Sequence, residues 1–342
     1  MRAARHEFAD DKHRPALVEQ LHCLGHWTEL VVGVAHGWKG SADLPARPVH
    51  ISYWRARAAR GRFLGMTQIA TDEADRALKA KHRAMWALGD YPTLAADLIA
   101  DLGTALVAAC GIRPGDRVLD VAAGSGNASI PAARLGARVV ASDLTPELLE
   151  NGRLHATALG ADIEWREADA EALPFADAEF DHVISCVGVM FAPHHQLSAN
   201  ELVRVCRPGG TIGLISWTPA GFIGQMFSTM KPYQAPPPPG AQPPPLWGDP
   251  DHVRTLLGDR VVDFSARRET VTVDRFASAE AFRDYFKSHY GPTIAIYKSI
   301  AGDPDKVAAL DRDLVDLARR HNRGTSSTVF DWEYLLVTAR RR

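Results

Sequence analysis

Residues 118–127 read Val-Leu-Asp-Val-Ala-Ala-Gly-Ser-Gly-Asn, an apolar run that enters a loop with two glycines. A helical pattern over Ala128–Leu135 follows directly. We therefore predict a strand over Arg117–Val121, a turn at Gly124 and Gly126, and a helix. Small residues in such a turn let a ligand approach the backbone, and the helix N-terminus offers unpaired N–H groups. Alone, a Gly-x-Gly loop of this kind occurs in many α/β proteins and indicates only a ligand-binding turn.

The alternation of strands and helices continues on both sides of this loop. Such alternation predicts a parallel sheet with helices on both faces, which right-handed crossovers wind into an open, doubly wound α/β fold. Upstream, the spacing of apolar residues predicts helices over Thr71–Leu88 and Leu94–Ala109. Downstream, the expected strands are Arg138–Ser142, Ile163–Ala168, His182–Val187 and Thr211–Ser216, and the expected helices are Pro146–Leu159, with Thr145 as N-cap, and Gln196–Cys206, which Arg207–Gly210 ends.

After Trp217 the alternation stops. Seven prolines between Ala235 and Pro245 predict a rigid surface loop rather than a helix or strand. The remaining patterns predict helices over Gly221–Met230, Ser278–Tyr290 and Pro304–Arg320, and strands over Val261–Val273 and Phe330–Ala339.

Composition excludes several classes of protein. The 342 residues are 46% hydrophobic and 23% charged, with 39 Lys and Arg against 41 Asp and Glu. This balance argues against a nucleic-acid partner bound through bulk charge. No apolar run approaches the roughly 18–20 residues that span a bilayer, so we expect no membrane insertion. The four cysteines are far apart, which favours a reducing cytoplasm and argues against a disulfide scaffold or a Cys-rich zinc site.

Residues 1–65 differ from the rest of the chain and are expected to form a poorly ordered extension. Met66 opens a sequence of ordinary globular character, so two alternatives stay open. Either the functional protein starts at Met66, or residues 1–65 form a regulatory or oligomerisation arm. His22, Cys23 and His26 offer metal-ligating atoms, but a trio within a histidine-rich stretch is usually incidental, and we predict no metal site.

Three carboxylates lie within or directly after predicted strands. Asp120 precedes the glycine loop, where a negative charge repels a pyrophosphate and suits a cationic ligand. Ser129 occupies the third glycine position of a dinucleotide-binding fingerprint, which also argues against a nicotinamide cofactor. Asp143 lies seventeen residues after Gly126, where it can accept hydrogen bonds from both hydroxyls of a ribose or cap the following helix. Asp169 ends the third strand, either as an acceptor for an adenine amine or as a solvated loop carboxylate.

Together with Ala170, Leu173-Pro174-Phe175, Phe180-Asp181 and Pro208-Gly209-Gly210, these residues resemble the class I S-adenosylmethionine-dependent methyltransferases. The sequence is most similar to the type 11 group, which includes methyltransferases of ubiquinone and menaquinone biosynthesis. The resemblance covers roughly residues 79–217. It implies a Rossmann-like sheet of seven strands, the last of them antiparallel, and S-adenosylmethionine as the cofactor.

The resemblance also implies roles for residues around the glycine loop. Gly124 and Gly126 would approach the amino-acid part of the cofactor, with Asp120 near its ammonium group. Asp143 would hold the ribose, and Leu144 would pack on the adenine. The expected cofactor-binding set is Asp120, Ala122, Gly124, Gly126, Asn127, Asp143, Leu144, Asp169, Ala170, Cys186 and Val187.

The methyl acceptor is expected to bind beside the cofactor. We divide residues 66–342 into a cofactor-binding core (112–217), acceptor and cap segments (218–325) and a final strand (330–340). His194 and His195 are the candidate catalytic bases, with solvated or capping histidines as the alternative. His82, Trp86 and Tyr290 are candidates for a lid. If many of the aromatic residues of these segments line one pocket, the acceptor is apolar or aromatic; the alternative, which we expect for most of them, is a place in the core. They are Trp217, Phe222, Phe227, Tyr233, Trp247, Phe282, Tyr285, Phe286, Tyr290 and Tyr297.

The sequence thus predicts a cytoplasmic S-adenosylmethionine-dependent methyltransferase that acts on a small apolar or aromatic acceptor. Its alternatives are an NAD(P)-dependent oxidoreductase and a non-catalytic S-adenosylmethionine-binding protein. Because a fold does not dictate the acceptor, methylation at O, N or C stays open, as does the oligomeric state.

Overall fold

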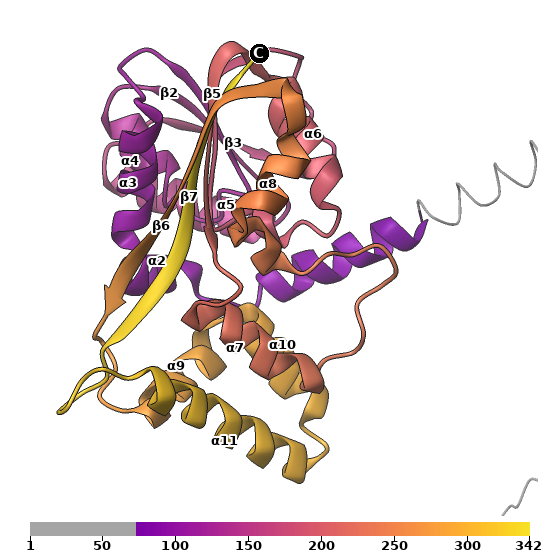
Figure 1. Ribbon diagram of the computed structural model, residues 1–342, viewed down its shortest axis with the longest axis vertical. Helices are drawn as coiled ribbons and strands as arrows, with labels where there is room; N and C mark the ends of the chain where they lie inside the picture. The colour runs from indigo at the N-terminus through magenta and orange to yellow at the C-terminus, as the bar shows by residue number, and fades with distance from the viewer. Residues whose placement is uncertain (1–72) are drawn as a thin grey trace, which may run out of the picture. The chain divides into compact units, whose positions relative to one another are not determined.

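The structure, a computed structural model, describes residues 73–342 (Figure 1). The predicted extension over residues 1–65 and its His22, Cys23 and His26 trio lie outside the described residues.

A seven-stranded sheet forms the centre of the described structure, in the order β3-β2-β1-β4-β5-β7-β6. Pairing among the first five strands is parallel, whereas β7 pairs antiparallel with both of its neighbours. The α/β fold with an antiparallel last strand, as expected from the sequence, is confirmed. The strands are β1 (Arg117–Val121), β2 (Arg138–Asp143), β3 (Ile163–Glu167), β4 (Phe180–Cys186), β5 (Cys206–Trp217), β6 (Val261–Val273) and β7 (Phe330–Arg341).

Helices cover both faces of the sheet. Figure 1 shows α3 and α4 on one side of the sheet and α6 and α8 on the other. Trp165 of β3 packs against both Gly126, just before α4, and Gly152 of α5. Besides a helix over 73–86, the helices are α2 (Tyr91–Leu98), α3 (Ala100–Cys110), α4 (Ser129–Arg134), α5 (Pro146–Ala158), α6 (His195–Val205), α7 (Phe222–Met230), α8 (Pro250–Leu257), α9 (Ala279–His289), α10 (Gly291–Ile300) and α11 (Pro304–His321).

The central strands are apolar because helices bury them on both faces. Val118, Leu119 and Val121 of β1 are completely buried, although successive side chains of a strand point to opposite faces. β1 lies between β2 and β4 in the sheet. The carboxyl ends of the parallel strands therefore meet at one edge, where the loops after β1, β2, β3 and β4 come together.

The structure corrects several predicted elements. The helix expected over Leu94–Ala109 is two helices that meet at Ile99 with a bend of 74°. The turn expected over 207–210 lies inside β5, which begins at Cys206 directly after α6. Helices α8 and α10 were not predicted, although each begins with a proline at its first turn, a position that suits a residue without an N–H.

Four helices, α7, α9, α10 and α11, form a cap at the carboxyl edge of the sheet (Figure 1). Two of these helices begin at N-cap residues of a type that favours helix initiation. The side chain of Ser278 accepts from the Ala281 N–H at the start of α9, and that of Asp303 accepts from the Lys306 N–H at the start of α11. The cap is joined to the sheet through β7. Phe222 of α7 stacks on Phe330, with ring centroids 4.8 Å apart, and lies parallel to Trp332.

Among residues 73–342, no single helix is long and apolar enough to cross a membrane; α2 and α3 pass that test only as a bent pair.

The Phe222 stack generates a prediction about the stability of the cap. Phe222 is 1% exposed, so Phe222→Ala removes a ring from a closed core and leaves a cavity. We expect the free energy of unfolding to fall by about 3–5 kcal/mol in urea denaturation. Leu154→Ala is the control, because Leu154 is 63% exposed and its truncation should change that free energy by less than about 0.5 kcal/mol. Similar losses for the two variants would show that Phe222 does not anchor the cap.

Candidate functional site

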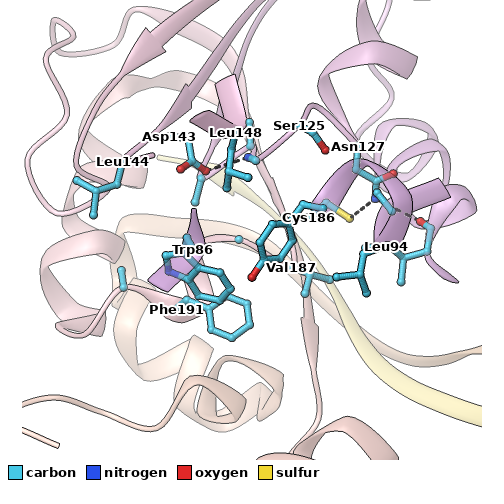
Figure 2. A pocket seen from close by; sticks show the side chains of 18 of the residues that line it. Trp86, Leu94, Ser125, Asn127, Asp143, Leu144, Leu148, Cys186, Val187 and Phe191 are labelled. Carbon is cyan, nitrogen blue, oxygen red and sulfur yellow. Dashed lines mark hydrogen bonds between the residues drawn. The ribbon is translucent and has the colours of Figure 1, made fainter. Parts of the chain in front are cut away.

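A cavity of about 200 Å³ opens at the carboxyl edge of the sheet, between the strand loops and the cap (Figure 2). This volume is several times the roughly 30 Å³ share of one water molecule, so the cavity has room for an organic ligand. Of the predicted residues, the wall includes Ala122, Gly124, Asn127, Asp143, Leu144, Asp169, Ala170, Cys186 and Val187, together with the lid candidates His82, Trp86 and Tyr290.

The loop after β1 brings backbone to the cavity surface. Gly124 has φ +56°, and a Cβ built there would meet no atom within 4 Å. A side chain at this position would therefore project into open space. Ala122 also adopts a positive φ, of 54°, which costs energy for any residue with a Cβ. The backbone of this loop is thus strained at Ala122, and the absence of a side chain at Gly124 leaves the cavity open beside the loop.

Asp143 ties the β1 loop to the β2 loop. Its Oδ2 accepts from the Gly124 N–H at 2.9 Å, and its Oδ1 accepts from the Thr145 N–H at 2.8 Å. Burial raises the pKa of this carboxyl, and the backbone N–H groups of Thr145 and Gly124 counteract that rise. Thr145 occupies the N-cap position of α5, but its side chain forms no capping hydrogen bond. Each Asp143 oxygen retains a lone pair, so the carboxylate can still accept from a ligand in the cavity.

Asp169 belongs to an ion-pair cluster centred on Lys79. The Lys79 Nζ lies 2.6 Å from Asp169, 2.9 Å from Glu171 and 2.8 Å from Asp75. Burial opposes a charge on Lys79, but the hydrogen bonds to Asp169, Asp75 and Glu171 outweigh it and raise the pKa of the ammonium group. The cluster fastens the helix over 73–86 to the loop after β3.

Asp75, Glu171 and His194 lie close enough together to hold a metal ion. The Lys79 ammonium group, however, already contacts Asp75 and Glu171 and supplies a positive charge between them. The geometry therefore favours an ion-pair cluster around Lys79 over a metal centre.

The loop after β4 carries a second strained residue. Val187 has φ +55°, a conformation that a β-branched side chain rarely adopts, and its N–H donates to the Ile215 carbonyl at 2.8 Å. Next to it, the Cys186 Sγ lies 3.6 Å from the Asn127 Nδ2. Burial raises the pKa of the Cys186 thiol, so this thiol stays neutral and is a poor nucleophile. Figure 2 shows Cys186, Val187 and Asn127 together on one part of the wall.

The other end of the cavity is aromatic. Trp86 of the first described helix contacts Phe191 and Tyr91, with ring centroids 4.7 and 5.6 Å apart. Trp86 and Phe191 lie side by side in Figure 2. The sheet and cap complete this wall with Trp217, Ile223, Met226, Phe286, Tyr290 and Trp332.

Two predicted cofactor-binding residues do not line the cavity. Gly126 packs beneath the loop, where a Cβ would lie 2.8 Å from the Trp165 ring, so its small size serves packing between helix and sheet. Asp120 is 1% exposed, and its Oδ2 accepts from the Ser129 hydroxyl at 2.6 Å. A direct contact between Asp120 and a ligand ammonium group is therefore absent from this arrangement.

The candidate bases His194 and His195 also lie outside the wall. The His194 N–H donates to Glu171, and the His194 Nδ1 lies 2.9 Å from the other Glu171 oxygen. His195 is completely buried, with its Nδ1 3.0 Å from the His252 Nε2. Burial lowers the pKa of His195 to about 4. Since neither ring reaches the cavity, the structure gives no support to the predicted catalytic role.

The predicted aromatic residues divide between cavity and core. Trp217, Phe286 and Tyr290 line the cavity, whereas Phe222, Phe282 and Trp247 are buried elsewhere. The remaining tyrosines donate to carboxylates outside the wall, namely Tyr233 to Asp313, Tyr285 to Asp97 and Tyr297 to Asp311, and Phe227 packs edge-on against Phe191.

Sequence reasoning missed Lys79, Tyr91 and Phe191. Lys79 shares a helix face with His82 and Trp86, because residues three and seven positions apart lie on one side of a helix. That spacing was the available signal for Lys79. Tyr91 and Phe191 carry no comparable local signal, since each reaches the cavity only through the tertiary packing around Trp86.

A family profile described as a methyltransferase domain matches residues 119–214, which extend from β1 into β5. An uncharacterized protein of Mycobacterium tuberculosis is 54% identical over 268 residues, which are 78% of this chain and 97% of the relative. A second uncharacterized protein of that organism is 52% identical over 276 residues, 81% of this chain and 100% of the relative. A demethylmenaquinone methyltransferase of a Mycobacterium species is 41% identical over 105 residues, which cover 31% of this chain and 43% of that protein.

The Lys79 cluster generates a prediction about stability. Lys79→Met keeps an apolar stem but leaves Glu171, whose side chain is 1% exposed, without its ammonium partner. We expect the free energy of unfolding to fall by about 1–3 kcal/mol in guanidinium denaturation, because the other members of the cluster are partly exposed. Arg166→Met removes the exposed pair with Glu164 and should change that free energy by less than about 1 kcal/mol. Equal losses would contradict a special role for Lys79.

Proposed function

Because the chain belongs to the class I S-adenosylmethionine-dependent methyltransferases, we propose that its cavity binds S-adenosylmethionine at the strand loops and a small apolar or aromatic acceptor beneath the cap. The observation that carries this proposal is the division of one cavity into two ends. Asp143 and Asp169 belong to the part of the lining that the strand loops contribute, and aromatic side chains, among them Phe286 and Tyr290 of the cap, form much of the remainder. A methyl donor and a methyl acceptor need adjoining subsites, and such a mixed lining offers polar groups to the one and apolar surface to the other.

The residues at the strand-loop end fit the cofactor. Open space above Gly124 leaves room for a ligand against the backbone, which any side chain there would fill. The buried Asp143 carboxylate offers lone pairs suited to ribose hydroxyls, and Asp169 and Ala170 lie at the end of β3 for an adenine edge. Leu144 and Leu148 supply apolar surface on which the adenine ring can pack.

The bound cofactor supplies a sulfonium methyl group, which is electrophilic without further activation. The task left to the protein is to align the acceptor with that methyl and exclude water, and orientation alone contributes up to about 7–11 kcal/mol. The helix over 73–86 lines both parts of the cavity, with Lys79 beside Asp169 and Trp86 in the aromatic wall. The cap, through Phe286 and Tyr290, encloses the acceptor end.

A protonated nucleophile also needs a base. Among the described residues that line the cavity, His82 is the one histidine. Burial lowers the pKa of His82, so its ring is neutral at pH 7 and can accept a proton. His82 therefore replaces His194 and His195 as the candidate base, in addition to its predicted place in the lid.

We infer the chemical class of the acceptor from the aromatic residues that line the cavity of this chain. The demethylmenaquinone methyltransferase aligns over 105 residues, less than half of its own length, so its quinone substrate is not transferred to this protein. In the described wall, Lys79 is the one lysine or arginine, and it is paired with carboxylates. We therefore expect a neutral acceptor rather than a phosphorylated or polyanionic one.

The ribose contact of Asp143 can be tested by calorimetry. We expect Asp143→Asn to weaken binding of S-adenosylhomocysteine by about 10- to 100-fold, because each charge-assisted hydrogen bond contributes about 1.5–3 kcal/mol. Asp177→Asn is the control, since the Asp177 side chain is 75% exposed. The affinity of this variant for S-adenosylhomocysteine should equal that of the wild type. Unchanged affinity in Asp143→Asn, with unchanged thermal stability, would refute the proposed contact.

The acceptor class can be tested with methyl-labelled S-adenosylmethionine and fractionated cell extracts. We expect label to enter products that partition into organic solvent, because the acceptor end of the cavity is apolar. Phe286→Leu should lower that transfer about tenfold or more while leaving S-adenosylhomocysteine affinity unchanged. Phe276→Leu is the matched control, because Phe276 packs against α9 and is similarly buried but does not line the cavity. Binding of cofactor without transfer to any fraction would favour a non-catalytic binding protein.

A further inference from the structure

Asp120 is a buried carboxylate that the proposed reaction does not use. It is 1% exposed, its Oδ2 accepts one hydrogen bond from Ser129, and its Oδ1 is buried without a hydrogen-bond partner. An ionised carboxylate in such a place loses its hydration without full compensation, which costs several kcal/mol. The position therefore favours a neutral acid until a positive charge comes near.

The elements packed around Asp120 provide no such charge among residues 73–342. Its β-sheet neighbours are Ala141 on β2 and Ile184 on β4, both apolar. The polar groups that face it are the Ser129 hydroxyl on α4, the Asp143 carboxylate on β2 and the Cys186 thiol on β4. Asp143 and Cys186 both line the cavity, so Asp120 lies directly behind that wall.

These surroundings determine how readily Asp120 releases its proton. Burial is the largest effect and raises the pKa of Asp120 to about 7; the Ser129 hydroxyl lowers this pKa, and the nearby Asp143 carboxylate raises it. A carboxyl group with this pKa is mostly protonated at pH 6 and mostly ionised at pH 8. A cation placed in the cavity favours the ionised form and so causes proton release.

We propose that Asp120 distinguishes the two forms of the cofactor by charge: it ionises when a sulfonium occupies the cavity and takes its proton back when the sulfonium has become a neutral thioether. This inference rests on the proposed function. The proton leaves to the solvent when the methyl donor binds and returns from the solvent after methyl transfer. Asp120 would thereby strengthen binding of S-adenosylmethionine relative to S-adenosylhomocysteine and favour release of the demethylated product.

Proton release can be measured directly by calorimetry on the full-length protein. S-adenosylmethionine is titrated at pH 6.0 and 7.0 in buffers of different ionisation enthalpy, and the dependence of the binding enthalpy on that enthalpy gives the number of protons released. We expect about 0.9 proton at pH 6.0 and about 0.5 at pH 7.0. The affinity for S-adenosylmethionine should fall about fivefold from pH 7.0 to 6.0. S-adenosylhomocysteine should release at most half as many protons and lose less affinity.

Two variants assign the proton to Asp120. Asp120→Asn cannot ionise, so its binding enthalpy should be the same in every buffer at pH 6.0. Ser129→Ala removes the hydroxyl donor to Asp120, so Asp120 is more fully protonated at pH 7.0, and the proton released on binding should rise above that of the wild type. If Asp120→Asn does not fold, the wild type and Ser129→Ala still decide the question.

The outcomes separate this inference from the proposed function. Binding of S-adenosylmethionine with no proton release at pH 6.0 would overturn the role of Asp120 and leave the cofactor assignment intact. Equal proton release for the two cofactor forms, or release that persists in Asp120→Asn, would also overturn it. Failure of the wild-type protein to bind S-adenosylmethionine even at pH 8.0 would instead refute the proposed function.

Discussion

The parallel register of β1 between β2 and β4 is the constraint on which the rest of the structure depends. Val121 at the end of β1 pairs with Ser142 of β2, and Asp120 pairs with Ile184 of β4. Because these strands run in the same direction and in register, their loops emerge at one edge. Residues far apart in the chain, such as Gly124, Asp143 and Val187, therefore meet around one cavity.

The site contains buried carboxyl groups, in which burial opposes the ionised form and hydrogen-bond donors or cations stabilise it. Asp143 lines the cavity and accepts a backbone N–H on each of its oxygens, and these two bonds favour its carboxylate form against the effect of burial. Glu171 is equally buried, but it relies on the Lys79 ammonium group and the His194 backbone N–H. Asp120 has neither arrangement. These three buried carboxyl groups differ in their partners, and the difference decides which of them can respond to the charge of a ligand.

Two non-glycine residues with positive φ flank the cavity, Ala122 after β1 and Val187 after β4. Neither conformation is favourable for its residue type, and each persists because neighbouring atoms fix the backbone. A Cβ on Gly188 would lie 2.1 Å from the Ala122 carbonyl oxygen, so the two strained loops touch. Such strain tends to be kept where the course of the backbone shapes a binding site. The close contact holds the loops after β1 and β4 together beside the cavity.

The sequence by itself determined the alternation of strands and helices, the position of the glycine loop and most of the residues at the strand-loop end of the cavity. These features follow from local patterns: apolar runs, turn residues and carboxylates at the ends of strands. Tertiary structure alone decided that His194 and His195 lie outside the cavity, that Gly126 packs on Trp165, and which aromatic residues line the cavity. An aromatic residue at helical spacing looks the same in sequence whether it faces a core or a cavity, because only the packing of distant elements determines which neighbours it meets.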